Sequence, residues 1–166
     1  MNPIPLGAGL VFFALFVAGC ATVTAPFREV DERWVDYKSW TVVEESTGDP
    51  TGRLGTVHKG PEGYRKVYVN ATGRDMLLGN GPYDFPEGTV IVKEQYSNEA
   101  DWQAGSKAAH TIMVKVAHTG EASKDNWRWA NSIKAEAKDD AFCWGCHGIN
   151  KTKDFTFTNG EFLATQ

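Results

Sequence analysis

Residues 143–147 read Cys-Trp-Gly-Cys-His, and no other run constrains this chain as strongly. Cys-x-x-Cys-His is the attachment pattern of a c-type haem. The thiols of Cys143 and Cys146 add to the two porphyrin vinyl groups, and His147 offers an imidazole nitrogen to the iron. A redox dithiol and half of a zinc site are the alternatives. A zinc site needs two more ligands, and the sequence has no second cysteine pair. We therefore expect one covalently bound haem c.

The N-terminal residues indicate export and lipid attachment. Residues 10–17 form an apolar run that is too short to span a bilayer comfortably. The run leads into Val-Ala-Gly-Cys, which resembles a bacterial lipobox, the pattern in which the cysteine, here Cys20, receives a diacylglycerol. Because residues 1–9 contain no Lys or Arg, an ordinary signal peptide and an uncleaved anchor remain alternatives. We expect a lipoprotein signal peptide over residues 1–19, a tether over residues 20–30 and one haem domain over residues 31–166.

Location and charge restrict the partners of this domain. The leader predicts a lipid-anchored protein on the periplasmic side of a bacterial membrane, and Ala21 after the cysteine favours the outer membrane. The three cysteines are used up by lipid and haem, so no thiol remains for a disulfide. The formal net charge is −4 and no basic stripe is present, which argues against binding to nucleic acid.

The middle of the chain alternates between apolar and polar residues, as strands do. Along residues 64–70, Arg65 shares a face with Val67 and Val69. An arginine on a core face needs an anionic partner, either a haem propionate or a buried carboxylate. Further strands are expected over residues 89–94, 111–117 and 126–130, helices over residues 33–40, 75–78 (or a turn there) and 131–142, and loops over residues 44–63 and 99–107.

Several of these runs occur in the same order as in a known family. They are Val-Tyr-Val-Asn at 67–70, Phe-Pro-Glu-Gly-Thr-Val-Ile-Val-Lys-Glu at 85–94, Asn-Trp at 126–127 and the haem motif. This succession resembles the cytochrome P-460 and cytochrome c′-beta family. The resemblance implies an α+β fold, with an antiparallel β-sheet, flanking helices and a haem held by the C-terminal motif. It also implies a periplasmic homodimer and a five-coordinate iron.

The resemblance gives three residues a role near the haem. Lys93 matches the lysine that bonds covalently to the porphyrin edge in cytochrome P-460. Phe85 matches a phenylalanine on the distal side of the iron, and Arg65 matches an arginine that meets a propionate. The residues themselves leave Lys93 open, because a lysine on the face of Ile91 is either partly buried and functional or solvated at a sheet edge.

Two classes of function follow from the resemblance. The first is an oxidoreductase that acts on hydroxylamine or nitric oxide at an open haem site, with a periplasmic redox partner. The alternative is a non-catalytic protein that binds nitric oxide or transfers electrons. Hydroxylamine-oxidising members place a distal carboxylate over the iron, whereas the corresponding strand here carries Met113 and Lys115 and no acid. The acids that remain are Glu94 and Glu121, and the candidates for a sixth iron ligand are Met76, Met113, His58, His110 and His118.

Overall fold

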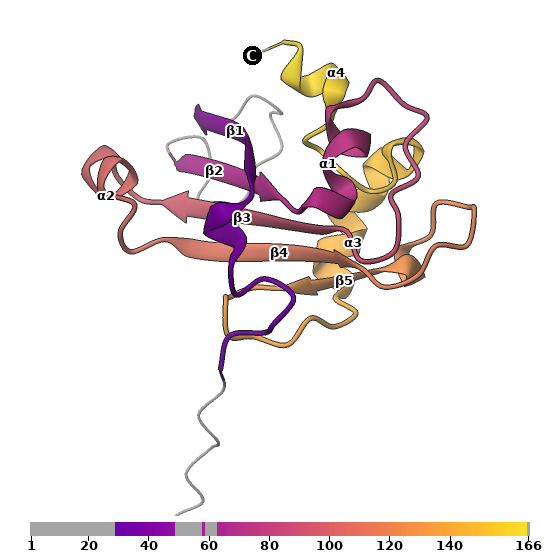
Figure 1. Cartoon of the computed structure of the whole chain (residues 1–166), viewed down its shortest axis with the longest axis horizontal. Helices are drawn as coiled ribbons and strands as arrows, with labels where there is room; N and C mark the ends of the chain where they lie inside the picture. Colours follow the sequence, from indigo (N-terminus) through magenta and orange to yellow (C-terminus); the bar gives the residue numbers. More distant parts are fainter. Residues whose placement is uncertain (1–28, 49–57, 59–62, 166) are drawn as a thin grey trace, which may run out of the picture.

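The computed structural model describes residues 29–48, residue 58 and residues 63–165. These residues form one antiparallel sheet of five strands in the order β1-β2-β3-β4-β5 (Figure 1). The strands are β1 Thr41–Thr47, β2 Tyr64–Val69, β3 Val90–Tyr96, β4 Ala109–Lys115 and β5 Trp127–Ala130. The helices are α1 Ala71–Leu78, α2 Glu99–Ala104, α3 Ala141–His147 and α4 Gly160–Leu163, with 3-10 helices η1 Tyr37–Ser39, η3 Lys124–Asn126 and η4 Gly148–Lys153. The expected α+β class with an antiparallel sheet and flanking helices is confirmed.

The sheet separates two hydrophobic clusters. Neighbouring antiparallel strands place paired residues on the same face, and the register pairs Val67 with Lys93 and Ile91 with Met113. These side chains lie on the face that packs against the C-terminal segment. The opposite face carries Tyr68, Val92 and Ile112, and it is covered by the N-terminal residues around Trp34 and Tyr37.

Short helices gather at one end of the sheet. Figure 1 shows α1, α3 and α4 at the same end, while α2 lies at the other end. Each of these four helices begins after an Asn or Asp whose side chain accepts a backbone N–H of the first turn; the capping residues are Asn70, Asn98, Asp140 and Asn159. Within the described ranges, no helix is long and apolar enough to cross a membrane.

Some sequence expectations for individual elements are wrong. The segment expected as a loop from residue 44 begins with the end of β1, whose bulge between Val42 and Glu44 breaks the alternation that identifies a strand. Residues 99–107 contain α2, which the cap Asn98 starts. Residues 131–142 are not one helix, because α3 begins only after Asp140. The expected helix over residues 33–40 is reduced to the single turn of η1. The other four strands lie within two residues of their expected bounds.

Candidate haem site

A pocket lies between the sheet and the C-terminal segment. Its floor is the face of β2, β3 and β4 that carries Val67, Ile91, Lys93, Thr111 and Met113. The C-terminal wall consists of Cys146 and His147 from α3 and of the residues Thr156, Phe157 and Thr158, and His58 completes the lining. The haem motif is thus brought against the face of the sheet from which Lys93 extends.

His147 is held in the tautomer that binds a metal. Its Nδ1 lies 2.6 Å from the carbonyl oxygen of Phe155, which only accepts hydrogen bonds, so Nδ1 donates. The lone pair is then on Nε2, and a second-shell carbonyl of this kind fixes the ring orientation. Burial lowers the pKa of His147 to about 4 against the opposing effect of the Phe155 carbonyl, and the charge of Lys93 lowers it further. The imidazole is therefore neutral at physiological pH.

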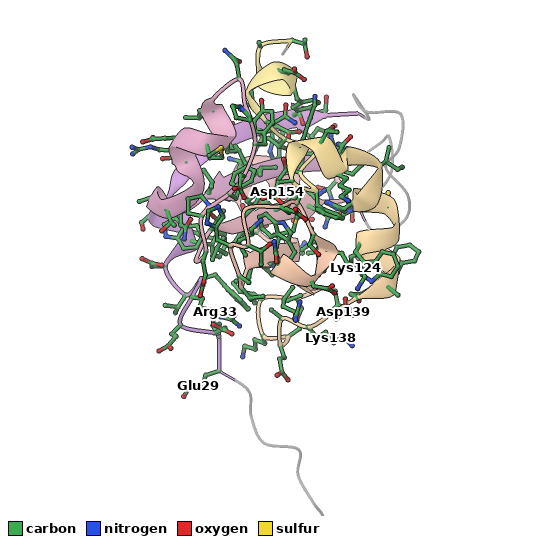
Figure 2. All side chains as sticks on the ribbon, turned by 90° about the vertical axis from the view of Figure 1, so that its right-hand side faces the viewer. Glu29, Arg33, Lys124, Lys138, Asp139 and Asp154 are labelled. Atoms are coloured by element: carbon green, nitrogen blue, oxygen red, sulfur yellow. The ribbon has the colours of Figure 1, made fainter. Side chains whose placement is uncertain are left out.

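Asp154 holds the turn that presents this carbonyl. Asp154 and Phe155 have φ of 49° and 66°, in the left-handed region that non-glycine residues rarely adopt. The Asp154 carboxylate is fully buried and accepts hydrogen bonds from Phe85 N at 2.9 Å, Lys115 Nζ at 2.5 Å and Trp127 Nε1 at 3.2 Å. Figure 2 shows Asp154 inside the molecule, in contrast to the peripheral Lys124, Lys138 and Asp139. The sequence analysis did not identify Asp154 and Phe155 as site residues. The only feature of the sequence that pointed to a buried acid was Lys115, the lysine on β4.

The surroundings of the two cysteines bear on the alternative of a redox dithiol. Neither forms a disulfide, Cys146 lines the pocket, and Cys143 packs against the hydrophobic cluster of the same sheet face. Burial, followed by the nearby charge of Asp140, raises the pKa of the Cys143 thiol to about 12. Redox-active cysteines in Cys-x-x-Cys motifs have lowered pKa values instead. The surroundings of Cys143 therefore argue against the dithiol alternative.

Lys93 lies within the pocket. It belongs to β3, pairs with Thr111 across the ladder to β4, and is partly buried. Its charge lowers the pKa of both His147 and His58, so it faces the same space as these two rings. Of the two interpretations that the residues left open, the structure favours the partly buried lysine over the solvated edge. Covalent bonding of Lys93 to a porphyrin stays a prediction.

Arg65 lies on the same sheet face as Val67, as expected, and is 3% exposed. Its guanidinium donates to Ser46 Oγ at 3.2 Å and to the carbonyl of Gly48. Ser46 in turn bonds the buried carboxylate of Glu44, which also accepts from the Thr158 hydroxyl at 2.9 Å. This polar chain therefore leads from Arg65 to the wall of the pocket, and contact between Arg65 and a propionate stays a prediction.

Phe85 is fully buried but does not line the pocket. Its ring packs edge-on against Trp127 at 5.8 Å between ring centres, and its backbone N–H binds Asp154. In the structure, Phe85 is therefore a core residue that supports the turn at Asp154 and Phe155, next to His147. A position of Phe85 on the distal side of the iron stays a prediction.

The candidates for a sixth ligand separate into two groups. His110 lies on the opposite face, where its Nε2 is 2.9 Å from the Tyr37 hydroxyl. His118 is exposed and 2.7 Å from Asp84, and Met76, which belongs to α1, is partly buried against the hydrophobic cluster. Only His58 and Met113 of the five candidates line the pocket.

No described Asp or Glu side chain lines the pocket. Glu94 is 1% exposed on the other face of the sheet, where its carboxylate accepts from the hydroxyls of Tyr37 at 2.6 Å, Tyr68 at 2.9 Å and Tyr96 at 2.6 Å. Glu121 is exposed in a turn. The part of the chain that the structure describes therefore does not supply the distal carboxylate of the hydroxylamine-oxidising members.

The residues around the pocket fit a haem. Nδ1 of His58 and Nε1 of Trp129 are buried and find no hydrogen-bond partner within the described ranges. The Trp129 ring lies 6.3 Å from that of His147, centre to centre. Such orphaned groups are uncommon in folded proteins, and a bound haem would be one partner for them. A haem offers a metal and two carboxylates as partners, beside an apolar floor.

This fold and this site define a haem protein of the c type, with the motif on a short helix packed against an antiparallel sheet. The family model described as Cytochrome P460 matches residues 35–158. The chain belongs to the cytochrome P460 family and is a c-type haem cytochrome. The resemblance drawn from the sequence motifs is thereby confirmed. No curated protein matches the chain.

Proposed function

We propose that the chain holds a single haem, attached through Cys143 and Cys146, with His147 as the proximal ligand of the iron. The support is the neutral His147 ring, whose Nδ1 is engaged by Phe155 and whose Nε2 keeps its lone pair. Both cysteines belong to the same helix as His147 and neither forms a disulfide, and their motif spacing is the one that the two vinyl groups need.

The proposed function is electron transfer or binding of a small nitrogen oxide, and one observation favours it over hydroxylamine oxidation. The pocket has no carboxylate among its described lining residues. Oxidation of hydroxylamine requires removal of protons, for which a positioned general base within hydrogen-bond reach is needed. A bound haem supplies one-electron chemistry and a metal site for small ligands. The chain contributes a fixed neutral imidazole and a floor that carries Val67, Ile91 and Met113 beside Lys93 and Thr111.

Hydroxylamine oxidation of the cytochrome P-460 type is the second candidate, and the position of Lys93 supports it. A lysine in the pocket beside His147 is what a cross-link to the porphyrin edge needs. Such a bond would distort the macrocycle, which is one way in which a protein tunes haem reactivity.

The test uses the purified holoprotein. Acid–acetone extraction should leave the haem on the polypeptide, and a Cys143→Ser/Cys146→Ser variant should release it. With hydroxylamine and an electron acceptor in excess, we expect no sustained turnover, whereas nitric oxide should change the visible spectrum or the iron should cycle reversibly between its two redox states. Sustained hydroxylamine oxidation would favour the second candidate instead.

We also propose that the protein is lipid-anchored at Cys20 on the periplasmic side of a bacterial membrane, where it exchanges electrons with a periplasmic redox partner, and that it forms a homodimer. The lipobox and the apolar run before it support the anchor and the location, although residues 1–28 lie outside those that the structure describes. The outer membrane is the proposed destination because Ala21 follows the cysteine.

A further inference from the structure

We propose that the buried ion pair of Lys115 and Asp154 positions the Phe155 carbonyl on His147 and thereby sets the reduction potential of the bound haem. The inference rests on the proposed function, in which His147 binds the iron. Neither Lys115 nor Asp154 lines the pocket, so both are positioning residues that act through the turn at Asp154 and Phe155.

The turn that carries this carbonyl has a strained backbone. Asp154 and Phe155 follow each other in the left-handed region, with φ of 49° and 66°. An aspartate tolerates this region, whereas a bulky residue such as phenylalanine is an outlier there. Backbone of this kind persists only where the surrounding structure enforces it. Its result here is that the Phe155 carbonyl oxygen lies 2.6 Å from Nδ1 of His147.

The backbone bonds of the turn do not tie it to the sheet. The N–H of Phe155 donates to the Asn150 carbonyl at 2.9 Å, and the Asn150 side chain donates to the Thr156 carbonyl at 3.0 Å. Both bonds join residues of the C-terminal segment to one another. The polar connection between this turn and the sheet comes from the Asp154 carboxylate.

Three donors from outside the segment hold the Asp154 carboxylate. One oxygen accepts from Lys115 Nζ at 2.5 Å and from Phe85 N at 2.9 Å, and the other accepts from Trp127 Nε1 at 3.2 Å. Lys115 is itself fixed, because its N–H donates to the Thr89 carbonyl at 2.9 Å and its ammonium lies 5.1 Å from the centre of the Trp127 ring. Strands β4 and β5 therefore determine where Asp154, and with it the next residue, can lie.

Stability alone does not account for a charged pair at this place. An apolar pair of similar volume in a protein interior is often as stable as a buried ion pair, or more stable. The ion pair differs from an apolar pair in direction, because each donor fixes one oxygen of Asp154. That direction holds the strained backbone in the conformation that points the Phe155 carbonyl at His147.

The position of this carbonyl has a chemical consequence for the haem. A carbonyl that accepts the Nδ1 proton makes the imidazole a stronger electron donor through Nε2. A stronger proximal donor stabilises the oxidised iron and lowers the reduction potential, since hydrogen bonding to an axial ligand is one of the means by which a protein tunes haem. Loosening of the turn should therefore raise the reduction potential.

The test compares the wild-type holoprotein with Lys115→Met/Asp154→Asn. This double variant removes both charges together, so it leaves no uncompensated charge in the interior. We expect the equilibrium between oxidised and reduced haem to shift about tenfold toward reduction, which is about 59 mV for a one-electron couple. The iron–histidine stretching band in the resonance Raman spectrum, recorded after photolysis of the carbon monoxide complex, should move to lower frequency.

Two further variants separate positioning from loss of stability. Glu94→Gln removes a buried charge from the opposite face of the sheet, and it should leave the potential and the stretching band unchanged. Trp127→Phe removes the indole donor to Asp154 and keeps an aromatic ring. It should shift both readouts in the same direction as the double variant but less, and it tests the inference even if the double variant does not fold.

Three outcomes would overturn the inference. The first is a folded double variant, or Trp127→Phe where the double variant does not fold, with the wild-type potential and stretching band. The second is a shifted potential with an unchanged band, which would show an effect of charge without movement of the imidazole bond. The third is an equal shift of both readouts in Glu94→Gln. Release of the haem from the wild type by acid–acetone would instead contradict the proposed function itself.

Discussion

The position of Lys93 in the pocket decides whether its side chain can react with a haem. It is partly buried, lines the pocket and lowers the pKa of His147 through its charge. The second candidate function predicts that in the mature protein Lys93 is bonded to the porphyrin edge. After proteolysis of the holoprotein, the peptide with Lys93 should then migrate together with the peptide that contains residues 143–147. Lys93→Ala should alter the spectrum of the reduced protein.

Lys66, one strand away on β2, is the control for this prediction. Its ammonium is 2.9 Å from Glu45 and it does not line the pocket, so Lys66→Ala should leave the spectrum unchanged. Clean separation of the two peptides, together with an unchanged Lys93→Ala spectrum, would show that the cross-link is absent. Electron transfer would then remain the better supported function.

Glu94 makes the stability of the fold depend on pH. Burial opposes ionisation of its carboxyl, but hydrogen bonds from Tyr37, Tyr96, Lys38 and Tyr68 outweigh it and lower the pKa of Glu94. A carboxyl with a lowered folded-state pKa stabilises the protein above its unfolded pKa of about 4.3, and this contribution is lost as the pH falls through the folded-state value. We predict that Glu94→Gln costs about 3 kcal/mol of unfolding free energy at pH 7.

The difference between wild type and Glu94→Gln, measured by urea unfolding, should shrink as the pH falls below about 4. Glu87→Gln is the control, because Glu87 is exposed and should show no such difference at either pH. A difference for Glu94→Gln that is constant from pH 7 to pH 3 would contradict the assignment of the effect to its charge.

The ion pair of Lys115 on β4 with Asp154 fixes the C-terminal segment to the sheet. Both side chains are fully buried. Removing one partner leaves an uncompensated buried charge, so we predict that Lys115→Met lowers the free energy of unfolding by about 3–5 kcal/mol. Adding Asp154→Asn should recover part of this loss, because Asn keeps the shape and tolerates the left-handed backbone. Thermal or urea unfolding of the three proteins measures both effects.

The matched control for the ion pair is Lys66→Met, since the Lys66–Glu45 pair is partly exposed and contributes about 0–1 kcal/mol. If Lys115→Met costs no more than Lys66→Met, the buried pair does not anchor the segment. If the double variant is no more stable than Lys115→Met, the loss comes from packing of the lysine chain.

Helix α4 packs directly on the end of α1. A Cβ atom added to Gly160 would lie 1.8 Å from the carbonyl oxygen of Gly79, far inside van der Waals contact. We predict that Gly160→Ala destabilises the protein by about 1–3 kcal/mol through this overlap. Gly148→Ala is the control, because the nearest atom to its Cβ lies at 3.9 Å and its backbone is helical, so its unfolding midpoint should not fall.

The elements that sequence could predict are those defined by local patterns. β2, β3, β4 and β5 have clear alternation, and the haem motif has fixed spacing, so each was found close to its place. β1 was missed because its bulge interrupts the alternation. The left-handed turn at Asp154 could not be found, because its partner Lys115 is 39 residues away and only the folded chain brings them together. The same holds for His58, whose position against His147 is a tertiary contact.

The whole molecule has two chemically different faces on one sheet. The pocket occupies one face, and the carboxylate network of Glu94 occupies the other, so the sheet separates the pocket from Glu94. Glu29, where the described chain begins, lies at the end of the molecule opposite α4 in Figures 1 and 2. A membrane anchor at the N-terminus would therefore hold the domain by the end that is remote from α4.

We predict that Cys20 carries a lipid that anchors the whole protein to a membrane. Cys20 precedes Glu29 by nine positions, which limits the reach of the anchor to about 30 Å from the membrane surface. A diacylglycerol with an added acyl chain exceeds the two signals that stable membrane attachment needs. In cells fed a clickable fatty acid, the wild type should be labelled and sediment with membranes. Cys20→Ser should lose the label, whereas Ala21→Ser, the neighbouring control, should keep it. An unlabelled, freely released wild type would show that the leader is an ordinary signal peptide.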